Sequence, residues 1–168
     1  DKPFCDFGQC KLYKFTGILT NLNQDDLSPR WTECHTESYQ TSGTSIPSTV
    51  LTKCPQANLM LACRQTGMKT LVVAAMAPRA DVIFDVGSAT YAHRIANGVA
   101  WYYSVSTSWG FFVPLDGVTR FNCDVADGIA PEKRLCWHTS GATLTSGYRC
   151  GTNKGLSAGW DRVIFQTQ

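Results

Sequence analysis

The chain has 168 residues, enough to bury one hydrophobic core, with an ordinary hydrophobic fraction of 43% and a low charged fraction of 17%. Its net charge is +2 and no run of Lys or Arg occurs, so we expect no nucleic-acid partner. The longest apolar run, residues 71–77, is too short to cross a bilayer, so the sequence predicts no transmembrane segment.

Short segments of β-branched and aromatic residues recur along the chain, separated by Gly, Pro, Asn and Asp. In chain order the predicted strands are residues 12–19, 31–34, 59–64, 70–77, 81–86, 91–96, 97–112, 118–123, 134–139, 147–150 and 161–166. Frequent short strands with turn signals between them are typical of an antiparallel β-sandwich or barrel. We therefore predict an all-β fold with little or no helix.

Residues 97–112 give the strongest strand signal. The pair Asn97–Gly98 favours a tight hairpin turn, and the apolar residues that follow alternate with polar or small ones. The polar run at residues 104–108 allows a second interpretation, in which it forms another hairpin tip. The aromatic residues on its two sides would then face each other across neighbouring strands.

Eight cysteines, an even number in a Thr-rich β protein with few lysines, indicate up to four disulfides and a secreted or extracellular location. Eight cysteines allow 105 pairings. Short loops favour the pairs Cys5–Cys10, Cys54–Cys63 and Cys136–Cys150, which leaves Cys34 with Cys123.

The domain organisation predicted is one secreted β domain over residues 1–168. A Ser/Thr-rich segment at residues 40–49 could separate a possible N-terminal extension, residues 1–53, from the rest. We favour one domain, because about 50 residues are marginal for an independent core.

No catalytic or metal-binding motif stands out. The histidines, His35, His93 and His138, lie outside any nucleophile-elbow or zinc-ligand spacing, and no cofactor is expected. Asp81 and Asp85 lie four residues apart on a predicted strand, too far apart for a retaining glycosidase pair. A weak calcium candidate is the acidic turn at Asp124 and Asp127.

Aromatic residues give the remaining functional signal. Tyr102 falls on the opposite side from the main apolar face, Trp109 flanks the polar tip, and Trp137 stands beside His138. Exposed aromatic rings with polar neighbours suit the C–H face and the hydroxyls of a sugar. The predicted ligand-binding residues are therefore Tyr102, Trp109, Trp137, His138 and Asn97.

The leading functional hypothesis is a secreted, non-catalytic, lectin-like domain that binds carbohydrate. An extracellular structural, adhesion or protein-interaction domain is the first alternative, because the same aromatic residues suit a protein interface. A secreted hydrolase that uses His93 or His138 with an Asp is the second alternative. The expected partner is thus a glycan or an extracellular protein surface, and the sequence does not determine the oligomeric state.

Overall fold

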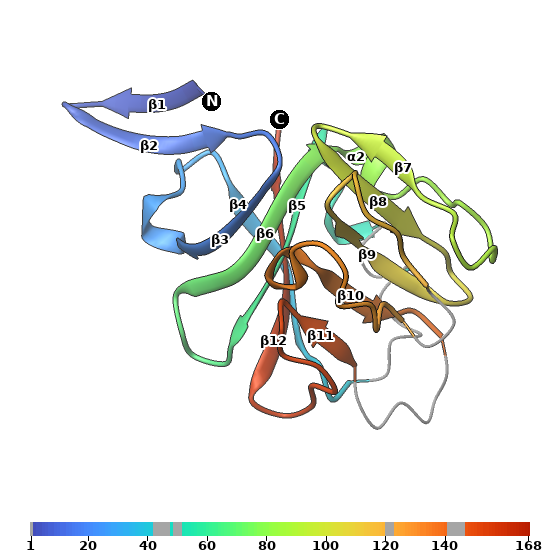
Figure 1. Cartoon of the computed structure of the whole chain (residues 1–168). Coiled ribbons are helices and arrows are strands. Elements are labelled where there is room, and N and C mark those ends of the chain that lie inside the picture. The colour runs from blue at the N-terminus through green and yellow to red at the C-terminus, as the bar shows by residue number, and fades with distance from the viewer. Residues whose placement is uncertain (1, 42–47, 49–51, 120–122, 141–146) are drawn as a thin grey trace.

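The computed structural model describes residues 2–41, 48, 52–119, 123–140 and 147–168. Within them, two five-stranded sheets pack face to face beside a separate two-stranded hairpin (Figure 1). The named strands pair antiparallel throughout. The predicted all-β fold class, an antiparallel sandwich with little helix, is confirmed.

The first sheet has the order β3 (Ile18–Asn23), β6 (Thr70–Pro78), β5 (Asn58–Gln65), β12 (Trp160–Thr167) and β4 (Thr32–Ser38). The second has the order β11 (Tyr148–Cys150), β10 (Leu135–His138), β9 (Ser108–Phe112), β8 (Val99–Tyr103) and β7 (Arg94–Ala96). The hairpin consists of β1 (Lys2–Asp6) and β2 (Gln9–Lys14). The elements that the structure describes in full also include a short α-helix, α2 (Arg79–Val82), and the 3₁₀ turns η1 (Gln24–Asp26) and η3 (Pro131–Lys133).

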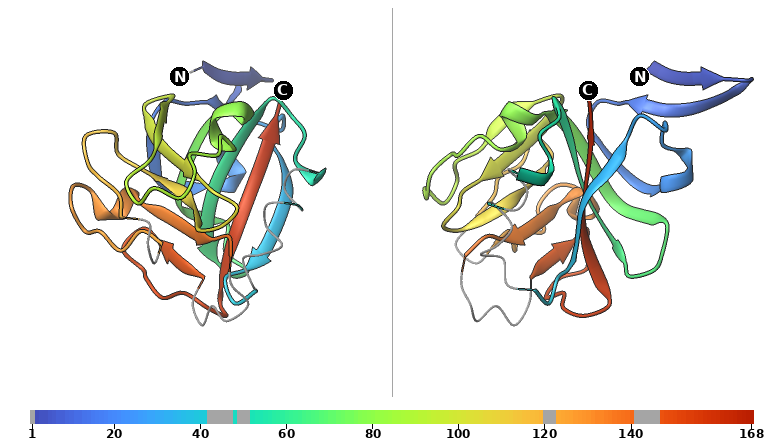
Figure 2. Two further views of the ribbon diagram at one scale, coloured as in Figure 1. Left: turned by 90° about the vertical axis from the view of Figure 1, so that its right-hand side faces the viewer. Right: turned by 180° about the vertical axis from the view of Figure 1, so that it is seen from behind.

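The N-terminal part of the chain is joined to the rest by strand pairing. β3 pairs with β6, and β4 pairs with β12 near the C-terminus. Figure 2 shows β4 running beside β12 along the edge of the first sheet. Most of the Ser/Thr-rich segment predicted at residues 40–49 lies outside the described residues.

The main core lies between the two sheets. Leu61 of β5, Val73 of β6 and Ile164 of β12 meet Trp101 and Trp109 of the second sheet there, and all five are buried. The predicted strand at residues 70–77 is buried on both faces, because a second cluster around Phe15, Leu27 and Trp31 covers the outer side of the first sheet. This explains why its sequence is continuously apolar instead of alternating.

Both hairpins predicted in residues 91–112 are present. Asn97 and Gly98 form the two-residue turn between β7 and β8 with φ angles of 52° and 72°, and the favoured hairpin turn requires both to be positive. β8 and β9 then pair around the polar tip, with Trp101 opposite Phe111. The second interpretation of the aromatic stretch is therefore the correct one.

Gly110 allows the second sheet to pack closely on its outer face. A Cβ there would collide with the carbonyl oxygen of Leu135 on β10 and with the hydroxyl of Tyr102. The ring of Tyr102 uses this space and its hydroxyl donates a hydrogen bond to the Leu135 carbonyl at 2.9 Å. We infer that any side chain at position 110 would separate β9 from its neighbours.

Two strand predictions need correction. Residues 81–86 are not a strand, since the chain turns into α2 after Pro78, and the carbonyl of Val82 accepts a hydrogen bond from the indole N–H of Trp109 at 3.0 Å. This contact holds the turn against the core, which a strand would not allow. Residues 12–19 are split between β2 and β3 by a bend at Gly17, and residues 118–123 lie partly outside the described residues.

All eight cysteines form disulfides, as predicted, but only one predicted pair is right. Cys5–Cys10 is confirmed. The other three bonds are Cys34–Cys54, Cys63–Cys150 and Cys123–Cys136, so the predicted pairs Cys54–Cys63, Cys136–Cys150 and Cys34–Cys123 are wrong.

The alternation of side chains across β10 and β11 explains the wrong pairing of Cys136 with Cys150. Cys150 lies opposite Leu135 and shares its inward direction, whereas Cys136 is the next residue along β10 and points outward. Cys150 therefore meets Cys63 of β5 across the core. This bond closes a loop of 87 residues and ties the two sheets together, a constraint that stabilises the fold by about 4–5 kcal/mol on chain-entropy grounds.

Four disulfides are typical of proteins that fold in an oxidising, extracellular-type environment. In the part of the chain that the structure describes, no helix has the length and apolar character needed to span a membrane.

Candidate functional site

The predicted aromatic platform is not at the surface. The side chains of Tyr102, Trp109 and Trp137 are 0% exposed. Trp109 and Trp137 pack edge to face between the sheets, with ring centres 5.6 Å apart, while Tyr102 lies on the outer face beneath Val118 and Cys123. The prediction of exposed aromatic rings at these positions is wrong, because the second sheet is covered on both faces.

His138 and Asn97, the other two predicted ligand-binding residues, lie far apart along the second sheet. His138 is half-buried at the end of β10 and its ring meets the edge of Tyr148, with centres 5.7 Å apart. Burial lowers the pKa of His138 and the positive charge of Arg162 lowers it further, so the imidazole is neutral at pH 7. Asn97 lies at the opposite end of β8, so the structure does not bring these two residues together.

The histidines proposed as catalytic bases make no hydrogen bond or ion pair with a carboxylate among the described residues. The Nδ1 atom of His93 contacts the carbonyl of Tyr91 at 2.9 Å. A different histidine has an acidic partner: the Nε2 atom of His35 lies 3.4 Å from Oε1 of Glu37. Arg162 on the neighbouring strand lies 3.6 Å from the same oxygen, so the carboxylate of Glu37 pairs with an arginine where β4 and β12 meet.

The acidic turn predicted as a weak calcium candidate is occupied by the protein's own cations. Asp124 is fully buried and accepts a hydrogen bond from Arg134 at 2.8 Å, with Arg149 4.0 Å away. Asp127 pairs with Lys154 at 2.6 Å and with Arg149 at 3.5 Å. The two carboxylates predicted as calcium ligands therefore pair with arginine and lysine side chains. No group of three metal-binding side chains occurs within the described ranges.

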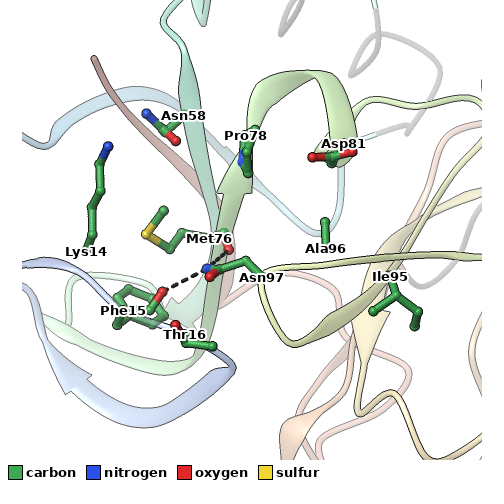
Figure 3. Close-up of a pocket in the computed structure, with 10 residues that line it drawn as sticks. All are labelled: Lys14, Phe15, Thr16, Asn58, Met76, Pro78, Asp81, Ile95, Ala96 and Asn97. Atoms are coloured by element: carbon green, nitrogen blue, oxygen red, sulfur yellow. Dashed lines mark hydrogen bonds between the residues drawn. The ribbon is translucent and has the colours of Figure 1, made fainter. Parts of the chain in front are cut away.

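The candidate site is instead a pocket of about 560 Å³ where the ends of β2, β5 and β6 meet the β7–β8 hairpin, named here the Asn97 pocket (Figure 3). Its lining combines polar and charged side chains with an apolar wall. The lining residues are Lys14, Phe15, Thr16, Asn58, Met76, Pro78, Asp81, Ile95, Ala96 and Asn97.

Asn97 is held rigidly at the centre of this pocket. Its side-chain amide donates one hydrogen bond to the carbonyl of Phe15 at 2.8 Å and another to the carbonyl of Met76 at 2.7 Å. These two bonds use both N–H groups of the carboxamide and tie the hairpin to the first sheet. The Oδ1 atom accepts no hydrogen bond from any described residue, so Asn97 presents a fixed acceptor in the pocket.

Three other side chains surround Asn97. Figure 3 shows Lys14 and Asn58 on one side and Asp81 on the other. Within the described part of the chain, the carboxamide of Asn58 makes no hydrogen bond and the ammonium of Lys14 makes no ion pair. One oxygen of Asp81 accepts a hydrogen bond from Nε of Arg94 at 2.6 Å, which fixes the carboxylate on the pocket wall.

The pocket thus offers donors and acceptors to a polar ligand. Asn58 and Lys14 supply N–H donors, while Asn97 and Asp81 supply oxygen acceptors. The side chains of Met76 and Pro78 form the apolar part of the wall. An arrangement of a few fixed polar groups beside apolar surface, within a few hundred Å³, is typical of small-ligand sites.

Of the residues in this pocket, only Asn97 was predicted from the sequence to bind a ligand. Lys14 and Asn58 carry no motif, and the sequence places Asp81 with Asp85 on a strand that does not form. The local signal at Asn58 is that a polar residue directly precedes the apolar run of residues 59–63. The pocket is assembled from four segments distant in sequence, so no local sequence motif indicates it.

Comparisons of the chain with protein-family models, with curated proteins and with solved structures find no match. Its function is therefore inferred from the geometry of its own residues.

Proposed function

We propose that this protein is an extracellular, non-catalytic domain that binds a carbohydrate in the Asn97 pocket. The observation that supports this proposal is the carboxamide of Asn97, which two backbone carbonyls fix in place while its oxygen is left for a ligand. Sugar hydroxyls both donate and accept hydrogen bonds, so they suit the mixture of amide, carboxylate and ammonium groups around it. The four disulfides support an extracellular location.

This proposal keeps the predicted class of ligand but moves the site. The tryptophans that suggested sugar stacking are structural, so the binding energy has to come from hydrogen bonds and from apolar contact with Met76, Pro78 and Ile95. Rigid polar groups lose little conformational entropy when they bind, which favours such a site even without an aromatic platform.

The test is a glycan-array screen, followed by titration calorimetry of the strongest glycan with Asn58→Ala. We expect Asn58→Ala to weaken binding about tenfold, because it removes a donor and an acceptor from the pocket. Gln65→Ala is the matched control, since Gln65 is an exposed amide at the other end of the same strand. If no glycan binds at millimolar concentration, or if both variants bind like the wild type, the proposal is wrong.

A second candidate function, protein interaction, is favoured by the β1–β2 hairpin. This hairpin projects from the sandwich in Figures 1 and 2, and Phe7 at its tip is 99% exposed. Phe7 has a φ of 47°, a conformation that bulky residues rarely adopt, and the Cys5–Cys10 disulfide closes the hairpin directly behind it. A rigidly presented aromatic side chain is typical of a residue that anchors a protein interface.

A pull-down of extracellular proteins in the presence of excess free sugar tests this second candidate. A specific partner should be retained by the wild type and by Tyr91→Ala, which removes another exposed aromatic, but not by Phe7→Ala. Equal retention by both variants would exclude the hairpin tip as the anchor.

A further inference from the structure

A second pocket adjoins the Asn97 pocket. It has a volume of about 510 Å³ and is named here the Tyr13 pocket; among the residues that line it are Tyr13, Arg30, Thr32, Gln56 and Gln166. These residues come from β2, β4 and β12, from the turn before β4 and from the segment before β5. The pocket lies at the same end of the first sheet as the Asn97 pocket, where the C-terminal end of β12 and the N-terminal end of β5 pair.

No residue lines both pockets, but two pairs of residues close in sequence lie at the boundary between them, which is called the shared wall. Tyr13 lines one pocket and Lys14 lines the other, and these are consecutive residues of one strand, so their Cα atoms are about 3.8 Å apart. Two residues apart in sequence, Gln56 lines the Tyr13 pocket and Asn58 lines the Asn97 pocket. The ammonium of Lys14 lies only 5.3 Å from the centre of the Tyr13 ring, which places its positive charge at this wall.

Two polar side chains of the Tyr13 pocket, Tyr13 and Gln166, are held in position by hydrogen bonds, as Asn97 and Asp81 are in the Asn97 pocket. The hydroxyl of Tyr13 donates to the carbonyl of Gln168 at 3.0 Å, and Arg30 lies 5.2 Å from the centre of its ring. The side chain of Gln166 accepts a hydrogen bond from the backbone N–H of Gln56 at 3.2 Å and donates one to the carbonyl of Lys53 at 3.5 Å. The side-chain carboxamide of Gln56 makes no hydrogen bond within the described ranges.

The side chains around the two pockets supply two cations, Lys14 and Arg30. The one side-chain carboxylate among the lining residues, Asp81, is already paired with Arg94. A ligand that crosses the shared wall therefore meets an ammonium group that no described carboxylate neutralises. An anionic group on the ligand satisfies it.

We propose that the Asn97 and Tyr13 pockets are adjoining subsites for one elongated ligand, an acidic oligosaccharide with a carboxylate that binds Lys14 at the shared wall. This inference rests on the proposed function and specifies its ligand. The inference predicts that affinity rises with the length of the oligosaccharide, because two linked contacts act together. It also predicts that affinity falls with added salt, because one contact is an ion pair.

The experiment measures affinity for uronic acids of three backbones, galacturonate, mannuronate and hyaluronan, each as its shortest unit and as a hexasaccharide. Hexagalacturonate with methyl-esterified carboxyl groups is the neutral match of equal length. We expect the best acidic hexasaccharide to bind at least about tenfold more tightly than its shortest unit, and esterification of the galacturonate to weaken binding by a similar factor.

Variants assign the two subsites. Lys14→Gln should abolish the advantage of the acidic over the neutral hexasaccharide and most of the salt dependence. Gln56→Ala should weaken the hexasaccharide but not the shortest unit, whereas Asn58→Ala should weaken both. Gln65→Ala, outside both pockets, should change neither.

The outcomes separate this inference from the proposed function. If neutral glycans bind in the Asn97 pocket with the same affinity as acidic ones, or if affinity is independent of glycan length, the two-subsite inference is wrong and the proposed function stands. If no glycan binds, acidic or neutral, both fail.

Discussion

Two polar regions of this protein differ in whether their polar side chains find hydrogen-bond partners within the protein. On the outer face of the second sheet, Arg134 and Arg149 are fully buried, and Arg134 donates to Asp124 at 2.8 Å while Arg149 donates to the carbonyl of Ala126 at 2.6 Å. In the Asn97 pocket, by contrast, the side chains of Asn97 and Asn58 keep polar atoms that no described residue satisfies.

The difference separates a structural polar cluster from a candidate binding site. Buried charges require partners, and Asp124, Arg134 and Arg149 pair with one another and with Asp116 and Asp127; this group, called the closed cluster, holds the loop before β10 to the sheet. Polar atoms that are fixed but unsatisfied at an open pocket contribute nothing further to folding. They are therefore where a ligand is expected to bind.

The largest effect that we predict is in the closed cluster. Asp124→Ala removes the fully buried carboxylate that lies beside two buried guanidinium groups, so the free energy of unfolding should fall by about 3–5 kcal/mol in urea titrations. Asp127→Ala is the control, because that carboxylate is largely exposed and its loss should leave the midpoint almost unchanged. A wild-type midpoint for Asp124→Ala would show that the cluster is not structural.

Asn97 should show an intermediate effect, because it belongs to both the hairpin and the pocket. Asn97→Gly keeps the positive φ but removes the bonds to Phe15 and Met76, and should cost about 1–3 kcal/mol. Asn97→Ala should cost about 1 kcal/mol more, because a Cβ disfavours this backbone conformation. Equal stability of Asn97→Gly and the wild type in urea would mean that the Asn97 side chain does not stabilise the packing of the β7–β8 hairpin on the first sheet.

A pH titration probes the edge of the closed cluster at Asp116. Burial alone raises the pKa of this carboxyl, but hydrogen bonds from the backbone N–H groups of Gly117 and Ile129 and from Arg134 hold it below the ordinary value. The folded state then binds the proton less readily than the unfolded chain, whose pKa is about 3.9. The stability from Asp116 is therefore present above that pH and is lost as the pH falls through the lower, folded-state pKa.

Thermal melts between about pH 6 and pH 2 measure this contribution. The midpoint should fall with acid less steeply in Asp116→Asn than in the wild type. An equally steep fall in both would assign the acid sensitivity to other carboxylates.

The smallest effect on stability is expected in the open region. Asn58→Ala should change the free energy of unfolding by less than about 0.5 kcal/mol, because its side chain makes no hydrogen bond to a described residue. The same variant should weaken glycan binding, so stability and binding separate at this position. A large loss of stability in calorimetric melts would place Asn58 with the structural residues.

Local sequence patterns were sufficient for the elements whose structure is set by near neighbours. The Asn97–Gly98 turn forms because both residues tolerate positive φ, and the polar tip at residues 104–107 separates β8 from β9 as one interpretation proposed. Cys5 and Cys10 pair because a two-residue turn places them opposite each other. Residues 81–86 alternate like a strand, but contact of α2 with the core overrides that local pattern.

The candidate site could be predicted only at Asn97. Lys14, Asn58 and Asp81 meet there because β2, β5 and α2 end at one edge of the sandwich, and strand order is not encoded in any short motif. The prediction of exposed aromatic rings failed for a related reason. Alternation shows on which face of a strand a side chain lies, but not whether other parts of the chain cover that face. Tyr102 does point away from Trp101, yet a loop and the Cys123–Cys136 disulfide bury it.

The sequence by itself determined that this chain is an all-β, fully disulfide-bonded domain-sized protein, because alternation, turn residues and an even set of cysteines act locally or through composition. Only the tertiary structure decided that Cys63 meets Cys150 across the core, that Trp109 and Trp137 are buried between the sheets, and that Asn97 lies beside Lys14, Asn58 and Asp81. Those relations depend on how two sheets stack and which strands become neighbours, and packing over the whole chain determines both.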